Sequence, residues 1–80
     1  MKLQIGSVVR ANAGRDKEKF FVVTGCDDGY YLIADGKERK LSHPKRKNPR
    51  HISATGSMID INDITDKKLR MLLRDYGCSE

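Results

Sequence analysis

The chain has 80 residues, with 16 Lys and Arg against 11 Asp and Glu, and a net charge of +5. A chain of this length forms one domain, residues 1–80, with a modest core. Two cysteines are too few for a disulfide framework, and no run approaches the roughly 20 apolar residues of a membrane-spanning helix. The start of the chain lacks the apolar core of a signal peptide. We therefore expect a soluble cytoplasmic protein with no membrane partner and reduced thiols.

Apolar patterning predicts three strands in the first half of the chain. Apolar and polar residues alternate over 3–10, which is typical of a half-buried strand. The run 20–24 is aromatic and β-branched, and the similar run 30–34 follows an Asp-Gly turn signal.

A second turn signal, at Asp35-Gly36, predicts a hairpin of the type I′ kind. We expect a short strand over 38–42 to return beside the strand 30–34. The segment 43–50 contains two prolines, which do not belong in a central strand, so it is predicted to be an extended, stiff, basic loop. The residues 51–55 are predicted to form a fifth strand.

The pattern changes to a helical period near the C-terminus. Four apolar residues have the i, i+3, i+4, i+7 spacing of one helix face: Leu69, Leu72, Leu73 and Tyr76. Thr65 suits the N-cap and Gly77 the C′ position, so a helix is predicted over 65–76, after a connector over 56–64. The expected fold is mostly β, a small five-stranded barrel over 3–55, with this helix packed onto an open barrel end.

The positive charge is concentrated in residues 37–51. This segment holds seven Lys and Arg residues against Glu38, a net charge of +6, while the remaining residues sum to −1. Such a local excess repels itself unless a polyanion neutralises it and releases counterions. Nucleic acid is the expected partner.

The first hairpin resembles a known family. The stretch from Gly6 to Val23 resembles the KOW motif, with Gly14 at the motif glycine and Arg15-Asp16-Lys17 at the basic turn that follows it. Further similarity lies in Ile33-Ala-Asp-Gly36 and Lys45-Arg-Lys-Asn48. The likeness covers about residues 3–55 and extends to small bacterial KOW-domain proteins, which are related to large-subunit ribosomal proteins of archaea and eukaryotes with an SH3-like barrel. The sequence departs from the motif at Glu18, where many KOW motifs carry a second glycine.

The resemblance implies a non-catalytic RNA-binding protein on an SH3-like barrel, associated with ribosomal RNA or the large ribosomal subunit. We expect a monomer when no RNA is bound, and the resemblance also allows contacts with ribosomal proteins. Glycine has no Cβ, so Gly14 would let the backbone approach a phosphate closely. The expected RNA-binding residues are Gly14, Arg15, Lys17, Arg39, Lys40, Lys45, Arg46, Lys47, Asn48, Arg50 and His51.

Three alternatives remain beside this hypothesis. SH3-like barrels also bind peptides, so a protein-interaction module of the transcription or translation machinery is the competing function. An enzyme is disfavoured, because the chain lacks phosphate-loop, H-E-x-x-H and G-x-S-x-G motifs. A zinc site of Cys26, His43, His51 and Cys78 is disfavoured by its spacing, so no metal or cofactor is expected.

Of the neighbours Tyr30 and Tyr31, one should face outwards, either as a stacking surface for bases or as cover for the barrel.

Overall fold

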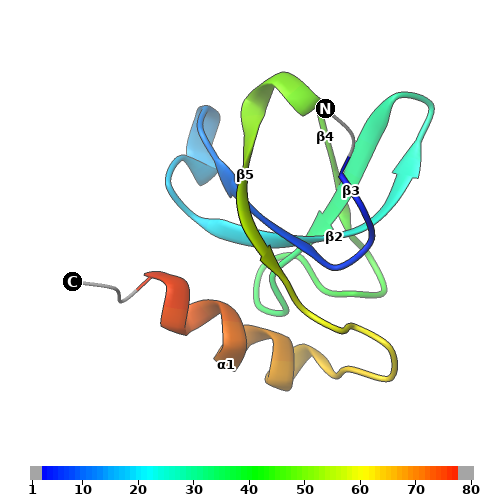
Figure 1. Cartoon of the computed structure of the whole chain (residues 1–80), viewed down its shortest axis with the longest axis vertical. Helices are drawn as coiled ribbons and strands as arrows, with labels where there is room; N and C mark the ends of the chain where they lie inside the picture. The colour runs from blue at the N-terminus through cyan, green and yellow to red at the C-terminus, as the bar shows by residue number, and fades with distance from the viewer. Residues whose placement is uncertain (1–2, 78–80) are drawn as a thin grey trace.

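The computed structural model describes residues 3–77, which form a five-stranded antiparallel sheet and a C-terminal helix (Figure 1). The elements in chain order are β1 (Ser7–Ala11), the 3₁₀ helix η1 (Gly14–Asp16), β2 (Phe20–Asp27), β3 (Tyr30–Ala34), β4 (Lys45–Lys47), the 3₁₀ helix η2 (Pro49–His51), β5 (Ile52–Met58) and α1 (Asp66–Gly77). The predicted mostly-β class with one terminal helix is confirmed.

The sheet is strongly curled. Its strand order is β4-β3-β2-β1-β5, so β4 and β5 are the two edges. A flat sheet of five strands would place its edges roughly 19 Å apart. Only residues 48–51 join these edges, and three of them form η2, in which each residue rises only about 2 Å. The sheet must therefore bend until its edges approach each other. Within residues 3–77 no ladder joins β4 to β5, so the sheet is open.

The prediction of a strand over 38–42 is wrong. Asp35 accepts hydrogen bonds at Oδ1 from the backbone N–H groups of Lys37 and Arg39, both at 2.9 Å, and this closes a longer turn than the predicted hairpin. The partner of β3 is instead β4, paired through Tyr31 with Lys47 and Ile33 with Lys45.

The predicted loop over 43–50 is therefore partly an edge strand. Pro44 and Pro49 flank β4 and do not interrupt it, which agrees with the confinement of proline to strand ends. Other boundaries also differ from the prediction. The second strand continues through Gly25 to Asp27, beyond its predicted end at residue 24. The first strand begins at Ser7, whose N–H donates to the carbonyl of Gln4 in a turn, and the last strand extends to Met58.

The apolar core has two parts on opposite faces of the sheet. The part inside the curl consists of Val9, Ala11, Phe21, Val23, Ile33 and Ile52. The part on the outer face consists of Val8, Val22, Ala34, Leu69 and Leu73. Neighbouring residues in a strand point to opposite faces, so both faces of the central strands are buried.

The helix α1 covers the outer face of the sheet, beside β2 in Figure 1. Thr65 is its N-cap, because its Oγ1 accepts a hydrogen bond from the Lys68 N–H at 3.1 Å. Leu69 is fully buried against the sheet, and the ring of Tyr76 lies 5.8 Å from that of Phe20. The predicted helix is confirmed, and Leu69, Leu73 and Tyr76 of its predicted apolar face pack on the sheet. Leu72 is half-buried and belongs to neither part of the core. Its predicted position at a barrel end is wrong, because the outward-facing apolar residues of β1, β2 and β3 provide its packing surface.

The helix also anchors the basic loop between β3 and β4. Gly36 is buried with φ +78°, and a Cβ at this position would overlap the carbonyl oxygen of Asp66. The Asp66 side chain accepts a hydrogen bond at Oδ1 from the Leu41 N–H at 2.8 Å, and Arg70 donates to the Gly36 carbonyl at 3.4 Å. The loop is therefore held by its own Asp35 on one side and by α1 on the other.

Candidate nucleic-acid interface

The β1–β2 loop presents η1 at one rim of the sheet. The loop is closed at its base, where the Ala11 N–H donates to the Lys19 carbonyl and the Glu18 N–H donates to the Ala11 carbonyl, at 2.9 and 2.6 Å. Gly14 has φ +78°, and its exposed side is open except for Nζ of Lys47, which lies 3.9 Å from the position of a Cβ. Glu18 also has a positive φ, +71°. This backbone region favours glycine, so Glu18 is held there at a cost of about 1 kcal/mol or more.

Four basic side chains from three segments of the chain surround one open hollow of about 490 Å³. They are Arg15 of η1, Lys19 before β2, Arg39 of the β3–β4 loop and Lys45 of β4; Glu38 is the acidic residue in the lining. We call this hollow the basic hollow. Folding therefore brings the glycine loop and the basic segment 37–51 together on one surface.

Lys19 lines the basic hollow, although it was not among the RNA-binding residues expected from the sequence. Its Nζ lies 3.5 Å from Oε1 of Glu38, and both side chains are about half exposed. A surface ion pair of this kind contributes at most about 1 kcal/mol and is screened by salt, so a phosphate can compete with Glu38 for Lys19. The signal for Lys19 was present in the loop sequence, but its proximity to Glu38 and Arg39 depends on the fold.

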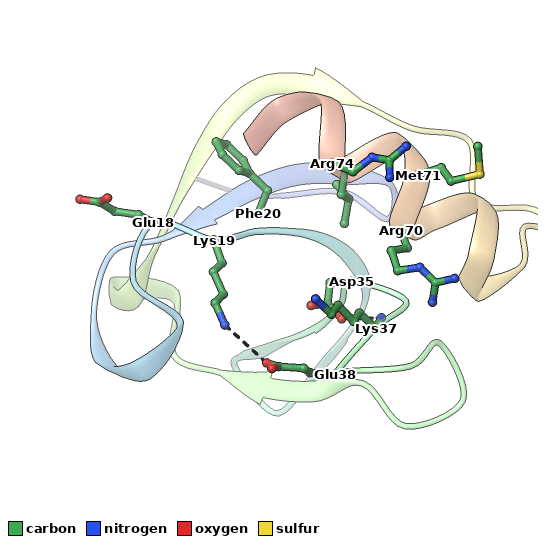
Figure 2. Close-up of a pocket in the computed structure, with 10 residues that line it drawn as sticks. Glu18, Lys19, Phe20, Asp35, Lys37, Glu38, Arg70, Met71 and Arg74 are labelled. Carbon is green, nitrogen blue, oxygen red and sulfur yellow. Dashed lines mark hydrogen bonds and ion pairs between the residues drawn. The ribbon is translucent and has the colours of Figure 1, made fainter. Parts of the chain in front are cut away.

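The same ion pair borders a second hollow, of about 440 Å³, between the β3–β4 loop and α1. Figure 2 shows Lys19 and Glu38 joined on one side of this hollow, with Arg70, Met71 and Arg74 of α1 on the other. Met71 is 46% exposed, which gives this hollow a mixed apolar and charged character.

Strand β4 divides its three cations between two faces. Lys45 and Lys47 pair with Ile33 and Tyr31, which face the inside of the curl, so these two lysines point to the inner side. Lys47 is only 8% exposed, and its aliphatic stem covers the edge of the core while its ammonium group reaches Gly14. Arg46 points to the outer side, away from the basic hollow.

The remaining expected contacts lie on exposed loops, apart from one capping residue. Lys17, Lys40, Arg50 and His51 are exposed. Asn48 is half-buried, and its Oδ1 accepts a hydrogen bond from the Arg50 N–H at 2.9 Å, which caps η2. The structure therefore brings Arg15, Arg39 and Lys45 to one hollow, with Gly14 and Lys47 beside it, and distributes the other cations over the surrounding surface.

Other chemistry was sought in the described part of the chain. Among residues 3–77, no group of three or more His, Cys, Asp or Glu side chains is arranged to hold a metal ion, and no helix is long and apolar enough to cross a membrane. Cys26 is an exposed free thiol. Cys78, which the zinc and disulfide alternatives required, lies outside the described residues.

No protein-family model matches the chain, and a search of characterised proteins returned no match. The KOW resemblance therefore depends on the motif residues themselves.

Proposed function

We propose that this chain is a non-catalytic RNA-binding protein of the KOW class, with an SH3-like barrel, that acts in the cytoplasm on ribosomal RNA or the large ribosomal subunit. One observation carries the proposal: Arg15 and Lys19 of the β1–β2 loop, Arg39 of the β3–β4 loop and Lys45 of β4 converge on the basic hollow. Like charges do not gather at one place without cost, and a polyanion relieves their repulsion.

The barrel part of the proposal is supported by the strand order. The last strand returns beside the first, and the short link between β4 and β5 draws the two edges of the sheet together. A curled sheet of this kind holds the β1–β2 and β3–β4 loops at fixed positions, so their cations can meet a folded sugar–phosphate chain without reordering. Phosphate and backbone contacts should dominate, because the deep groove of an RNA helix is closed to side chains.

A matched pair of variants tests the proposal. Arg15→Ala with Arg39→Ala removes two charges from the basic hollow, and Lys67→Ala with Lys68→Ala removes two charges from exposed positions on α1. Each lost phosphate contact should reduce the slope of log K against log[salt] by about 0.7–0.9, so the first variant should lose about 1.4–1.8. Fluorescence anisotropy with a structured ribosomal RNA fragment at several salt concentrations measures both quantities.

We expect the hollow variant to bind at least tenfold more weakly at low salt and the helix variant to bind within about twofold of the parent protein. Equal effects of the two variants would show that only net charge matters for binding and would refute a specific role of the basic hollow. An absence of any complex at micromolar protein in dilute buffer would refute RNA binding itself. Sedimentation of a lysate at low and high salt then tests association with the large subunit.

A protein-interaction module is the second candidate, and the hollow beside α1 favours it. That hollow combines the apolar side chains Phe20, Met71 and Leu73 with charged residues, as peptide-binding surfaces do. Affinity purification with and without ribonuclease separates the candidates. Partners that persist after digestion support this second function.

A further inference from the structure

The outer side of the β2–β3 hairpin carries an aromatic–cation pair that lies outside the basic hollow. The guanidinium carbon of Arg46 lies 4.4 Å from the centroid of the Tyr30 ring. Asp27 Oδ2 lies 3.7 Å from Nε of Arg46, and Tyr30 and Asp27 are paired across the hairpin. Asp27 thus approaches the guanidinium at its Nε atom, while the ring of Tyr30 lies beneath the group.

This pair lies on the opposite side of β4 from the lysines. Arg46 pairs with Leu32, and the alternation along a strand turns it away from Lys45 and Lys47. Tyr31, the neighbour of Tyr30, has the opposite role: it packs against the inner core, and its hydroxyl oxygen accepts a hydrogen bond from the Leu3 N–H at 3.0 Å. One of the two neighbouring tyrosines faces outwards, as expected, and the structure shows that it is Tyr30.

Both members of the pair are accessible to solvent. Tyr30 is 37% exposed, and the Arg46 side chain is 51% exposed although one part of it covers the ring. A guanidinium plane stacked on an aromatic ring offers its free face to a second planar group, and unpaired nucleobases stack on both aromatic and guanidinium planes. Both side chains lie outside the two core clusters. A structural role in the core therefore does not explain why the two side chains are paired and exposed.

We propose that Tyr30 and Arg46 form a stacking surface for one unpaired nucleobase, while the phosphates of the same RNA occupy the basic hollow. This inference rests on the proposed function and specifies its ligand as RNA with a single-stranded, bulged or looped nucleotide. A paired and stacked base within a duplex cannot present its face to the surface, so the stacking surface distinguishes unpaired RNA from duplex.

The test compares two probes, a single-stranded 12-mer RNA and a blunt duplex of the same sequence. Tyr30→Leu removes the ring, Tyr30→Phe retains it, and Arg46→Lys retains the charge but removes the guanidinium plane. Base–aromatic stacking predicts that Tyr30→Leu weakens binding of the 12-mer on the order of tenfold, and that Tyr30→Phe leaves it unchanged. Arg46→Lys should weaken it similarly without changing the salt slope, because the number of charges is the same.

The duplex probe provides the internal control, and all three variants should bind it within about twofold of the parent protein. Thermal unfolding should be close to that of the parent protein, because the pair lies outside the core. Equal losses for both probes, or equal behaviour of Tyr30→Leu and Tyr30→Phe, would overturn the stacking surface. If Arg15→Ala with Arg39→Ala weakens both probes while Tyr30→Leu weakens neither, only the stacking inference fails. If the parent protein binds neither probe, the proposed function fails with it.

Discussion

Replacing Gly36 by alanine tests whether α1 anchors the basic loop. The new Cβ would overlap the Asp66 carbonyl oxygen and lie 3.1 Å from the Arg70 nitrogen, both in the backbone of α1. Backbone cannot rotate away as a side chain can, so the loop and the helix must separate. The matched control is Gly29→Ala, because Gly29 has a similar φ of +85° but nothing within 4 Å of a Cβ.

The expected magnitudes follow from these two environments. Both substitutions place alanine in left-handed backbone, at a cost of roughly 1 kcal/mol each. Only Gly36→Ala adds an overpacking cost of about 1–3 kcal/mol. A difference near 2 kcal/mol corresponds to about 8–16 °C in Tm for a domain of this size. Both variants should still fold, since an 80-residue domain has about 4–12 kcal/mol of stability.

Urea unfolding followed by far-ultraviolet circular dichroism measures the difference in the free energy of unfolding. We expect a lower midpoint for Gly36→Ala at an unchanged m value, which would show a loss of stability in one cooperative unit. Equal midpoints for the two variants would refute the close packing of the loop against α1.

Two further predictions concern the basic hollow and its edge. Glu38→Gln releases Lys19 from its ion pair, so RNA affinity at low salt should rise several-fold and the salt slope should steepen by up to about 0.7–0.9. The control Asp75→Asn makes the same change in net charge at an exposed position of α1 and should have a smaller effect. Equal gains in the two variants would contradict the role of Glu38. Lys47→Ala should lower the free energy of unfolding, measured in urea, by about 1–2 kcal/mol because the buried aliphatic stem is lost. Lys47→Met keeps an aliphatic stem and should retain most of that stability. An identical loss in both variants would mean that the charge and not the stem is responsible.

The sequence predicted the strands that contain apolar residues and missed the one whose residues are all charged. Strands β2 and β3 follow from their aromatic and β-branched runs. Strand β4 has no such signal, because its three residues are Lys45, Arg46 and Lys47, and only pairing with β3 makes it a strand. The long turn before it follows from the Asp35 carboxylate, which competes with the two-residue hairpin that the Asp-Gly pair favours.

The position of the helix could have been predicted from a signal that the sequence contains. Consecutive apolar residues such as Val8-Val9 and Val22-Val23 indicate strands that are buried on both faces. Strands buried only on the inner face of a barrel would show alternating apolar and polar residues. The consecutive apolar pairs therefore indicate a second apolar layer on the outer face, and α1 provides that layer.

Most residues of the candidate site were predictable from the sequence, but Lys19 and the grouping of the residues were not. The density of charge in 37–51 and the Gly14 turn are visible in the sequence. That Arg46 lies apart from Lys45 and Lys47 depends on strand alternation, and that Lys19 joins the hollow depends on the folded loops. Alanine at all of 45–47 would therefore mix a loss of core packing with losses on two separate faces.

If the β3–β4 loop binds RNA as proposed, the contact between Gly36, Leu41 and α1 would give the C-terminal helix a role in that binding. If RNA immobilises the β3–β4 loop, it must also slow the opening of the helix that clamps this loop, because thermodynamic coupling is reciprocal. Amide hydrogens of α1 would then exchange with solvent more slowly in the complex.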